Sequence, residues 1–248
     1  MSRTTAPLLI DCGNSRLKWA HAASDAWRSQ AVPYIAASLR DVAQRAFADA
    51  PPPESIWVSC VAGESTCAAL AHFLSQRFGV APKFVRATAS AAGVHNRYTR
   101  PEQLGADRWV ALVGARALTS AACAVIDCGT AVTVDALNAK GEFVGGVIFP
   151  GLRLARASLA QATSALDTAP GSGESCLARS TADAIAAGTR YGIAGAIERV
   201  VREFEATLGP LEWIATGGDA PQVLPLLSAA ARHEPDLVLK GLARLAAP

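Results

Sequence analysis

The stretch Leu8-Leu9-Ile10-Asp11-Cys12-Gly13-Asn14-Ser15 decides the fold, because much of it returns as Ala124-Val125-Ile126-Asp127-Cys128-Gly129-Thr130. In each copy an apolar run, typical of a buried strand, breaks into a glycine turn that carries a carboxylate and a hydroxyl. Such a turn offers backbone N–H groups, an oxygen ligand for a cation and room for a phosphate. The copies are separated by nearly half of the 248 residues. We therefore expect an α/β protein of two related halves, with a nucleotide cleft between them.

The composition describes a folded chain of low net charge. Hydrophobic residues make up 51% and charged residues 18%, and the formal net charge is +2. Such a small charge gives no support for binding to nucleic acid or to an acidic membrane. No run of 18 apolar residues occurs, so no membrane span is expected. The apolar run at 8–10 is too short for a signal peptide, and we expect a cytoplasmic protein.

The cysteines indicate the same compartment. They stand at positions 12, 60, 67, 123, 128 and 176, and no Cys-x-x-Cys pair occurs. Cys12 and Cys128 end apolar strands, where a thiol behaves as a small hydrophobic group. We therefore expect all six cysteines to be reduced.

The first half alternates predicted strands and helices, which favours a mainly parallel sheet covered by helices. The boundary between the halves is expected near residue 118, which gives domains of residues 1–118 and 119–248. A polar connection over 86–103 is longer than linkage alone requires, and such loops are often functional. The pattern predicts a hairpin of strands 8–10 and 17–21, a helix over 38–50, a strand over 55–61, a helix over 65–78, a strand over 83–85 and a helix over 104–118.

The second half repeats the plan. Its elements are predicted as strands over 123–127, 131–137 and 141–149, a helix over 152–161, a Gly/Ser-rich loop over 170–174 and a helix from Ser180 or Thr181 to about 208. A further apolar strand ends in Gly217-Gly218, where a ligand such as an adenine or a ribose could approach the backbone.

The long helix carries Gly188, Gly192 and Gly195 on one face. Each glycine costs a helix about 1 kcal/mol relative to alanine, so something is expected to approach this face closely. Packing of another helix of the same chain and a homodimer contact both explain it.

Common nucleotide motifs are absent from the sequence. The dipeptide Gly-Lys of a Walker motif does not occur, and neither does Gly-x-Gly-x-x-Gly. What remains is the turn from Asp11 to Lys18, whose ammonium could reach a phosphate from the returning strand.

The order of two phosphate turns and a Gly-Gly adenosine turn resembles the superfamily of acetate and sugar kinases, actin and heat-shock chaperones, with two ribonuclease H-like (actin-like ATPase) domains. Within it, the stretch from Asp11 to Lys18 resembles the first phosphate motif of type III pantothenate kinases. The segment Asn96-Arg97-Tyr98, followed by Leu104-Gly105-Ala106-Asp107-Arg108, resembles the substrate segment of that family. Ser15 stands where the family usually has threonine, and it keeps the hydroxyl.

The resemblance implies a kinase that phosphorylates the 4′-hydroxyl of pantothenate with ATP, the first step of coenzyme A biosynthesis. It implies Asp107 as the base, and a carboxylate at a helix start is suited to that role. It also implies a homodimer, and a cofactor set of ATP, Mg²⁺ and a monovalent cation, K⁺ or NH₄⁺, with the monovalent cation at Asp127. The implied ATP-binding residues are Asp11, Cys12, Gly13, Asn14, Ser15, Arg16, Leu17, Lys18 and Thr130. The implied pantothenate-binding residues are Tyr98, Gly105, Ala106, Asp107, Arg108 and Thr181.

Two other functions fit the same fold. One is a non-catalytic nucleotide-binding regulator, which has no reason to combine Asp107, Arg108 and the Tyr98 loop. The other is an exopolyphosphatase-like hydrolase, which needs a basic groove that the near-zero net charge does not favour.

Overall fold

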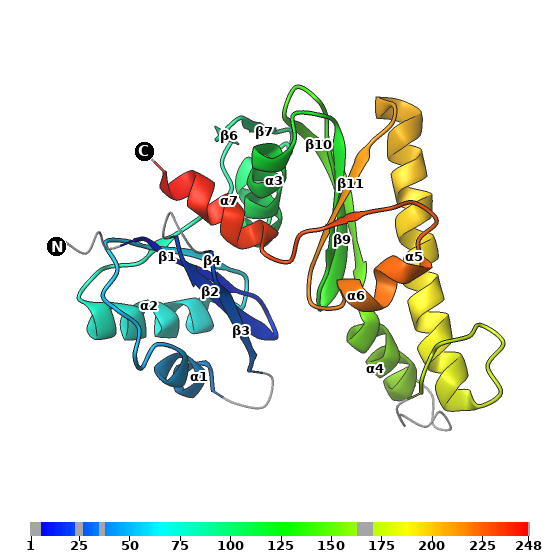
Figure 1. Cartoon of the computed structure of the whole chain (residues 1–248), viewed down its shortest axis with the longest axis horizontal. Coiled ribbons are helices and arrows are strands. Elements are labelled where there is room, and N and C mark those ends of the chain that lie inside the picture. The colour runs from blue at the N-terminus through cyan, green and yellow to red at the C-terminus, as the bar shows by residue number, and fades with distance from the viewer. Residues whose placement is uncertain (1–5, 23–26, 35–37, 163–170, 248) are drawn as a thin grey trace. The chain divides into compact units, whose positions relative to one another are not determined.

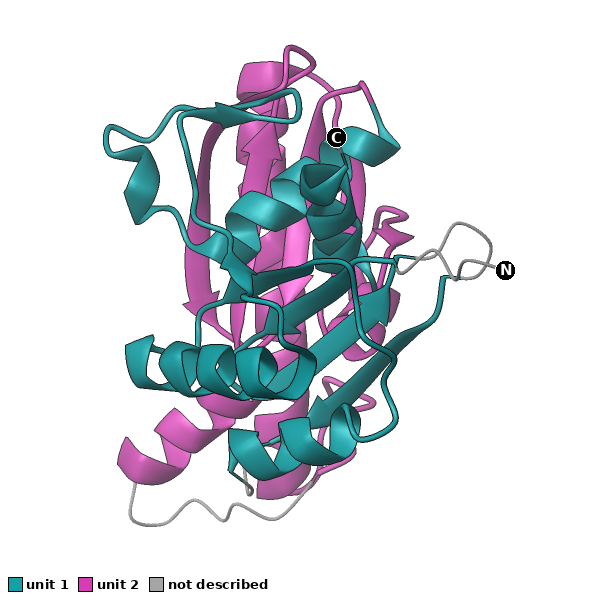
Figure 2. Ribbon diagram, turned by 90° about the vertical axis from the view of Figure 1, so that its left-hand side faces the viewer, with its two compact units in different colours: residues 1–119, 236–248 teal, residues 120–235 magenta. Residues whose placement is uncertain are grey.

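The computed structural model describes residues 6–22, 27–34, 38–162 and 171–247. The chain divides into two compact units (Figure 2). Unit 1 comprises residues 1–119 and 236–248, and unit 2 comprises residues 120–235. The last helix of the chain therefore belongs to unit 1, although the predicted second domain, 119–248, includes it.

Unit 1 is built on a five-stranded sheet in the order β3-β2-β1-β4-β5. Helices α1 and α2 lie on one face of this sheet, and α3 and α7 lie on the other (Figure 1). The strands are β1 (Leu8–Cys12), β2 (Arg16–His21), β3 (Ser29–Pro33), β4 (Ile56–Cys60) and β5 (Lys83–Phe84). The helices are α1 (Leu39–Ala46), α2 (Glu64–Phe78), α3 (Ala106–Leu118) and α7 (Leu237–Ala246), and the connection before α3 holds β6 (Ser90–Ala91), β7 (Val94–Asn96) and η1 (Pro101–Gln103).

The alternation of side chains along β1 determines which residues face the site. Leu8, Ile10 and Cys12 are fully buried in the core that α1 and α2 cover. Because successive side chains of a strand point to opposite faces, Leu9 and Asp11 are directed to the face of α3 and α7. The carboxylate of the first phosphate turn is thereby turned away from the α1 and α2 core.

Unit 2 contains a sheet in the order β12-β11-β8-β9-β10. Its main core lies between this sheet and the helices α4, α5 and α6, with Ile126 of β8 and Ile197 of α5 fully buried in it. The strands are β8 (Cys123–Cys128), β9 (Ala131–Leu137), β10 (Glu142–Pro150), β11 (Glu212–Thr216) and β12 (Arg232–His233). The helices are α4 (Leu152–Ala162), α5 (Thr181–Leu208), α6 (Ala220–Val223) and the short η2 (Leu224–Leu226).

The two sheets have the same topology, which confirms the predicted relation between the halves. In each, three strands follow one another as a meander, β1-β2-β3 and β8-β9-β10. Two further strands then add to the other side of the first strand in parallel, β4 and β5 in unit 1 and β11 and β12 in unit 2. The order of strands therefore repeats along the chain.

The predicted mainly parallel character of the sheets is wrong, because both sheets are mixed. The meander pairs are antiparallel, and the pairs made by β4, β5, β11 and β12 are parallel. Tight turns such as 13–15 and 129–130 return the chain as hairpins, and only the connections that contain helices produce parallel strands.

The expectation of six reduced cysteines is also wrong, because the structure joins Cys60 and Cys67 in a disulfide. Cys60 ends β4 and Cys67 lies in the first turns of α2, so their Cα atoms are 6.3 Å apart, within the range that a disulfide spans. Cys12, Cys123 and Cys128 are buried thiols that lie outside this disulfide.

The predicted elements are otherwise present within a few residues of their expected ends. Pro170, the first residue of the predicted Gly/Ser-rich loop, lies outside the described residues. Among the helices of the described ranges, none is both long and apolar enough to cross a membrane.

Candidate functional site

The first phosphate turn is closed by backbone hydrogen bonds. The Gly13 N–H donates to the Arg16 carbonyl at 3.1 Å, and the Tyr34 N–H donates to the Ser15 carbonyl at 3.1 Å. The Tyr34 hydroxyl also donates to the Gly13 carbonyl. Of the predicted ATP-binding residues, Cys12 and Leu17 bury their side chains in the core of unit 1. The turn therefore offers a ligand its backbone and the more exposed residues 13–16.

A half-buried carboxylate, that of Asp11, stands at the start of this turn. Burial and the neighbouring charge of Asp107 raise the pKa of Asp11 to about 7, although Lys18 and the Ser59 side chain oppose the shift. Lys18 is the Cα partner of Asp11 in the β1–β2 pair, and Ser59 is its partner in the β1–β4 pair. The fold thus brings Asp107, which is distant in sequence, into one electrostatic group with Asp11 and Lys18.

Asp107 lies in the first turn of α3. Its Oδ1 accepts a 2.7 Å hydrogen bond from the Arg108 N–H. Burial raises its pKa, and the hydrogen bonds to backbone amides and the charge of Arg108 only partly offset the shift. Gly105 begins the helix, and a Cβ there would lie 2.7 Å from Asp107 Oδ1. A side chain at position 105 would therefore displace the Asp107 carboxylate from its place over the helix end.

Arg108 is held between the loop and the helix. Its side chain is 7% exposed, and its Nη1 donates to the Tyr98 hydroxyl at 3.0 Å. The loop is fixed in turn by Asn96, whose Oδ1 accepts from the Tyr98 N–H at 3.0 Å and whose Nδ2 donates to the Pro101 carbonyl at 3.1 Å. The structure thereby joins Tyr98 and Arg108, two of the predicted pantothenate-binding residues.

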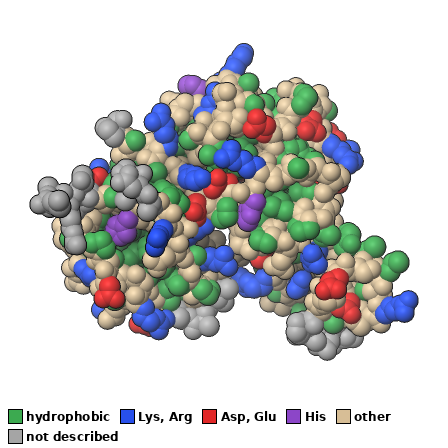
Figure 3. All heavy atoms as spheres, viewed as in Figure 1, with side chains coloured by type: hydrophobic (Ala, Val, Ile, Leu, Met, Phe, Trp, Pro, Cys, Tyr) green, Lys and Arg blue, Asp and Glu red, His purple; other side chains and the backbone are tan. Residues whose placement is uncertain are grey.

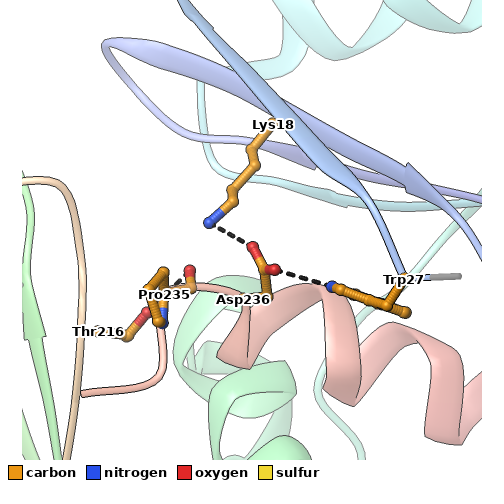
Figure 4. A network of polar contacts seen from close by, with 5 residues as sticks. All are labelled: Lys18, Trp27, Thr216, Pro235 and Asp236. Atoms are coloured by element: carbon orange, nitrogen blue, oxygen red, sulfur yellow. Dashed lines mark hydrogen bonds and ion pairs between the residues drawn. The ribbon is translucent and has the colours of Figure 1, made fainter.

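One group next to Lys18 is not evident from the sequence. The Lys18 ammonium lies 2.7 Å from Asp236 Oδ1, and the Trp27 indole N–H donates to Asp236 Oδ2 at 2.7 Å (Figure 4). Asp236 is the residue immediately before α7. An acidic residue before an apolar helix is a possible helix start, but nothing in the sequence indicates that it contacts Lys18.

In unit 2, the turn after β8 contacts the turn after β11. The Asp219 N–H donates to the Cys128 carbonyl at 2.9 Å. Gly217 has a φ of +94°, and a Cβ there would overlap the Cys128 carbonyl, so both its conformation and its surroundings require glycine. The second phosphate turn and the predicted adenosine turn are therefore adjacent.

The remaining sequence motifs of unit 2 support the same turn or start α5. Gly151 donates its N–H to the Thr130 carbonyl at 3.0 Å, so the end of β10 holds the residue predicted to bind ATP. Ser180 is the residue that caps α5, because its Oγ accepts from the Asp183 N–H at 3.1 Å. Thr181 follows as the first residue of the helix, with an exposed side chain.

The structure divides the predicted site residues between the units. Unit 1 holds the turn residues 11–18, Tyr98 and residues 105–108, and unit 2 holds Asp127, Thr130 and Thr181. Within the described residues, no group of three His, Cys, Asp or Glu side chains is placed to hold a metal ion.

Comparison with known proteins identifies the relatives of this chain. A sequence model of the family described as Type III pantothenate kinase matches residues 7–203. The chain belongs to the type III pantothenate kinase family. The type III pantothenate kinase of Aromatoleum aromaticum is 45% identical over 96% of this chain and 97% of its own length. That of Nitrosococcus oceani is 38% identical over 96% and 93%.

Solved structures of low sequence identity share the fold. One is the activator of the 2-hydroxyisocaproyl-CoA dehydratase from Clostridium difficile, with a TM-score of 0.55, 10% identity and coverage of 97% of this chain and 92% of that one. A ROK family glucokinase from Streptomyces griseus gives a TM-score of 0.53 at 13% identity and covers 97% and 98%. The two mixed sheets are therefore those of the actin-like ATPase fold.

Proposed function

We propose that this chain transfers the γ-phosphoryl group of ATP to the 4′-hydroxyl of pantothenate, the first step of coenzyme A biosynthesis. The observation that carries the proposal is the group of Asp11, Lys18 and Asp107 in a chain of this family. Phosphoryl transfer needs positioned charges on the phosphates and a carboxylate that takes the proton of the attacking hydroxyl. That group offers both.

Asp107 is the base in this proposal. The 4′-hydroxyl of pantothenate gives its proton to the Asp107 carboxylate as its oxygen bonds to the γ-phosphorus, and the bond to the leaving ADP oxygen breaks. A raised pKa suits this role, since a base is most effective when its pKa approaches the working pH. Arg108 binds the pantothenate carboxylate in a bidentate manner, with Tyr98 holding the guanidinium. Gly105, Ala106 and Thr181 complete the proposed pantothenate contacts.

The phosphates of ATP are assigned to the turn of residues 11–18 and to Thr130. Backbone N–H groups and the side chains of Asn14, Ser15 and Lys18 contact the phosphates, and Asp11 holds Mg²⁺ that neutralises their charge. A cation beside Asp11 favours the ionised carboxylate, and it thereby offsets the burial and the Asp107 charge that raise the pKa of Asp11 in the protein alone. Asp127, at the end of β8, is the proposed ligand of K⁺ or NH₄⁺.

The two other functions explain less of the structure. A nucleotide-binding regulator gives no role to the raised pKa of Asp107 or to the Tyr98–Arg108 pair. A polyphosphatase needs a basic groove, whereas basic and acidic side chains are interspersed on the face seen in Figure 3. The chain also has a net charge of only +2. Pantothenate kinase activity in the cytoplasm remains the proposal.

The proposal is tested by measuring ATP consumption by the full chain with and without pantothenate, in a coupled assay for ADP. ADP is expected to form only when pantothenate is present, together with one equivalent of 4′-phosphopantothenate. A hydrolase is favoured if ADP forms at the same rate without pantothenate, with water or added polyphosphate as the acceptor of the phosphoryl group. Nucleotide binding without turnover favours a regulator.

The activity is expected to require a monovalent cation in addition to Mg²⁺. Asp127 supplies an anionic oxygen at a strand end, and added positive charge there helps to hold the ATP phosphates. Rates are therefore expected to be high in K⁺ or NH₄⁺ and low in Na⁺, measured at constant ionic strength. Equal rates in K⁺, Na⁺ and a bulky organic cation contradict the proposed site.

A homodimer is proposed on the exposed face of α5. Gly188, Gly192 and Gly195 share this face with Tyr191, which is 39% exposed, and a Cβ at any of the three glycines would meet no described atom within 4 Å. Packing by another part of the described chain therefore does not explain the glycines. Sedimentation at micromolar concentration is expected to give a dimer, and Tyr191→Asp is expected to give a monomer. A fully active wild-type monomer contradicts this proposal.

A further inference from the structure

The ion pair between Lys18 and Asp236 joins the phosphate turn to the C-terminal helix of unit 1. Lys18 lies on β2, opposite Asp11 and two residues after the turn closed by Gly13 and Arg16. Asp236 lies at the start of α7, and the oxygen–nitrogen distance is 2.7 Å. The side chains of Lys18 and Asp236 are only 19% and 16% exposed. A pair so little exposed is screened much less by salt than one on the open surface.

Asp236 is itself held in place by a second contact. One carboxylate oxygen forms the ion pair with the Lys18 ammonium, and the other accepts the hydrogen bond from the Trp27 indole N–H (Figure 4). Burial raises the pKa of Asp236, but the hydrogen bonds from Lys18, Ser29 and Trp27 and the Lys18 charge outweigh it, and the pKa is lowered. The carboxylate is therefore ionised at neutral pH and cannot rotate freely away from Lys18.

The helix that carries Asp236 is packed directly on the helix that carries Asp107. A Cβ at Gly114 of α3 would overlap the Leu237 carbonyl, and a Cβ at Gly241 of α7 would overlap the Val110 carbonyl. The backbones of α3 and α7 thus touch at two points. Asp236 and Asp107, at the starts of the two helices, are fixed relative to each other, and Lys18 is fixed through Asp236.

We propose that Asp236, supported by Trp27, is a positioning residue that holds the Lys18 ammonium in the place where it meets the phosphates of ATP. This rests on the assignment of Lys18 to the phosphates in the proposed function. A free lysine side chain samples many rotamers, and confining it before the nucleotide binds lowers the entropy lost on binding. An ammonium also has three N–H donors, so its contact with Asp236 is compatible with donation to a phosphate.

Asp236 can also weaken nucleotide binding, and removing its charge then changes the dissociation constant in the opposite direction. A carboxylate 2.7 Å from the ammonium reduces its attraction for phosphate, so its removal strengthens nucleotide binding if charge neutralisation dominates. If positioning dominates, its removal weakens binding. The double contact of Asp236 and the close packing of α7 favour positioning, because both hold the ammonium in one place.

The test is a double-mutant cycle on the full chain with Lys18→Ala, Asp236→Asn and the double variant. The readout is the dissociation constant of a non-hydrolysable ATP analogue with Mg²⁺, measured by titration calorimetry. Asn keeps the shape of Asp and removes its charge. Asp236→Asn is expected to bind roughly 10-fold more weakly, the lower end of what loss of a residue that orients a metal ligand costs. Lys18→Ala, which removes the phosphate contact itself, is expected to bind at least as weakly. The double variant is expected to bind no more weakly than Lys18→Ala, because Asp236 acts through Lys18.

Steady-state kinetics provide the readout that a purely structural role would not move. Asp236→Asn is expected to raise KM for ATP while KM for pantothenate stays unchanged. Glu203→Gln is the control, because it removes a carboxylate from the exposed Arg199–Glu203 pair on α5 and is expected to change neither. Trp27→Phe keeps both charges but removes the N–H, and it is expected to weaken analogue binding less than Asp236→Asn does. If Asp236→Asn does not fold, the cycle is carried out with Trp27→Phe and Lys18→Ala.

Three results overturn the positioning role. The first is that the effects of Lys18→Ala and Asp236→Asn on the dissociation constant multiply in the double variant. The others are unchanged or tighter binding in Asp236→Asn, and no analogue binding by the wild type. A wild type that binds the analogue but does not phosphorylate pantothenate refutes only the proposed function. In that case the cycle still decides whether Asp236 positions Lys18.

Discussion

Replacing Asp107 with Asn is expected to lower the rate of pantothenate phosphorylation by ~10²–10⁴-fold, the range of general-base contributions. Asn keeps the size of Asp and can still accept the 2.7 Å hydrogen bond from the Arg108 N–H. It cannot take the proton of the 4′-hydroxyl. The loss is therefore expected in kcat, with little change in the affinity for an ATP analogue.

The thermal midpoint of the same variant separates catalysis from folding. Burial raises the pKa of Asp107, so removing the charge is not expected to destabilise unit 1 strongly. If Asp107 only stabilised the start of α3, Asn would do so almost as well and the rate would survive. Wild-type turnover in Asp107→Asn refutes the assignment of the base, and a large fall in the midpoint attributes the loss to folding.

Local sequence patterns predicted the repeat and the turns correctly. The runs ending at Asp11 and Asp127 are β1 and β8, each followed by a hairpin. The alternation of strands and helices predicted strand direction less well. It favoured parallel strands and took no account of the antiparallel meander that each hairpin begins. Strand direction depends on the length of each connection, and the turns at 13–15 and 129–130 are too short for a parallel crossover.

Residues of the candidate site could be proposed from the sequence only where they are close in sequence or match a family motif. The turn of residues 11–18 and the Tyr98–Arg108 segment are of this kind. Trp27 and Asp236 are 209 residues apart, and their hydrogen bond exists because the chain returns to unit 1 for its last helix. The Cys60–Cys67 disulfide was missed although its cysteines are only seven residues apart, because the expected reducing compartment and the lack of a Cys-x-x-Cys pair argued against any pairing.

The contact between α3 and α7 predicts the second large effect, which is on stability. Gly241→Ala is expected to lower the free energy of unfolding by about 3 kcal/mol, near the upper end of ordinary overpacking costs. The new Cβ would overlap the Val110 carbonyl oxygen and lie 2.8 Å from Val110 Cγ1. The gain in helix propensity from Gly to Ala is only about 1 kcal/mol, so the steric overlap outweighs it and the free energy of unfolding falls. A fall of the thermal midpoint on the order of 5–10 °C is the expected measurement.

Two further variants show whether the loss comes from this backbone contact. Gly114→Ala tests the other side, because its Cβ would overlap the Leu237 carbonyl, and it is expected to destabilise similarly. Arg244→Ala changes an exposed residue in the last turn of α7, and a shift within about 0.5 kcal/mol is expected. Since Asp236 begins α7, separating the helices also displaces the carboxylate beside Lys18, and Gly241→Ala is expected to bind the ATP analogue more weakly even below its midpoint. A Gly241→Ala protein as stable as the wild type would show that α3 and α7 can move apart without cost, and the fixed placement of Asp236 would then be wrong.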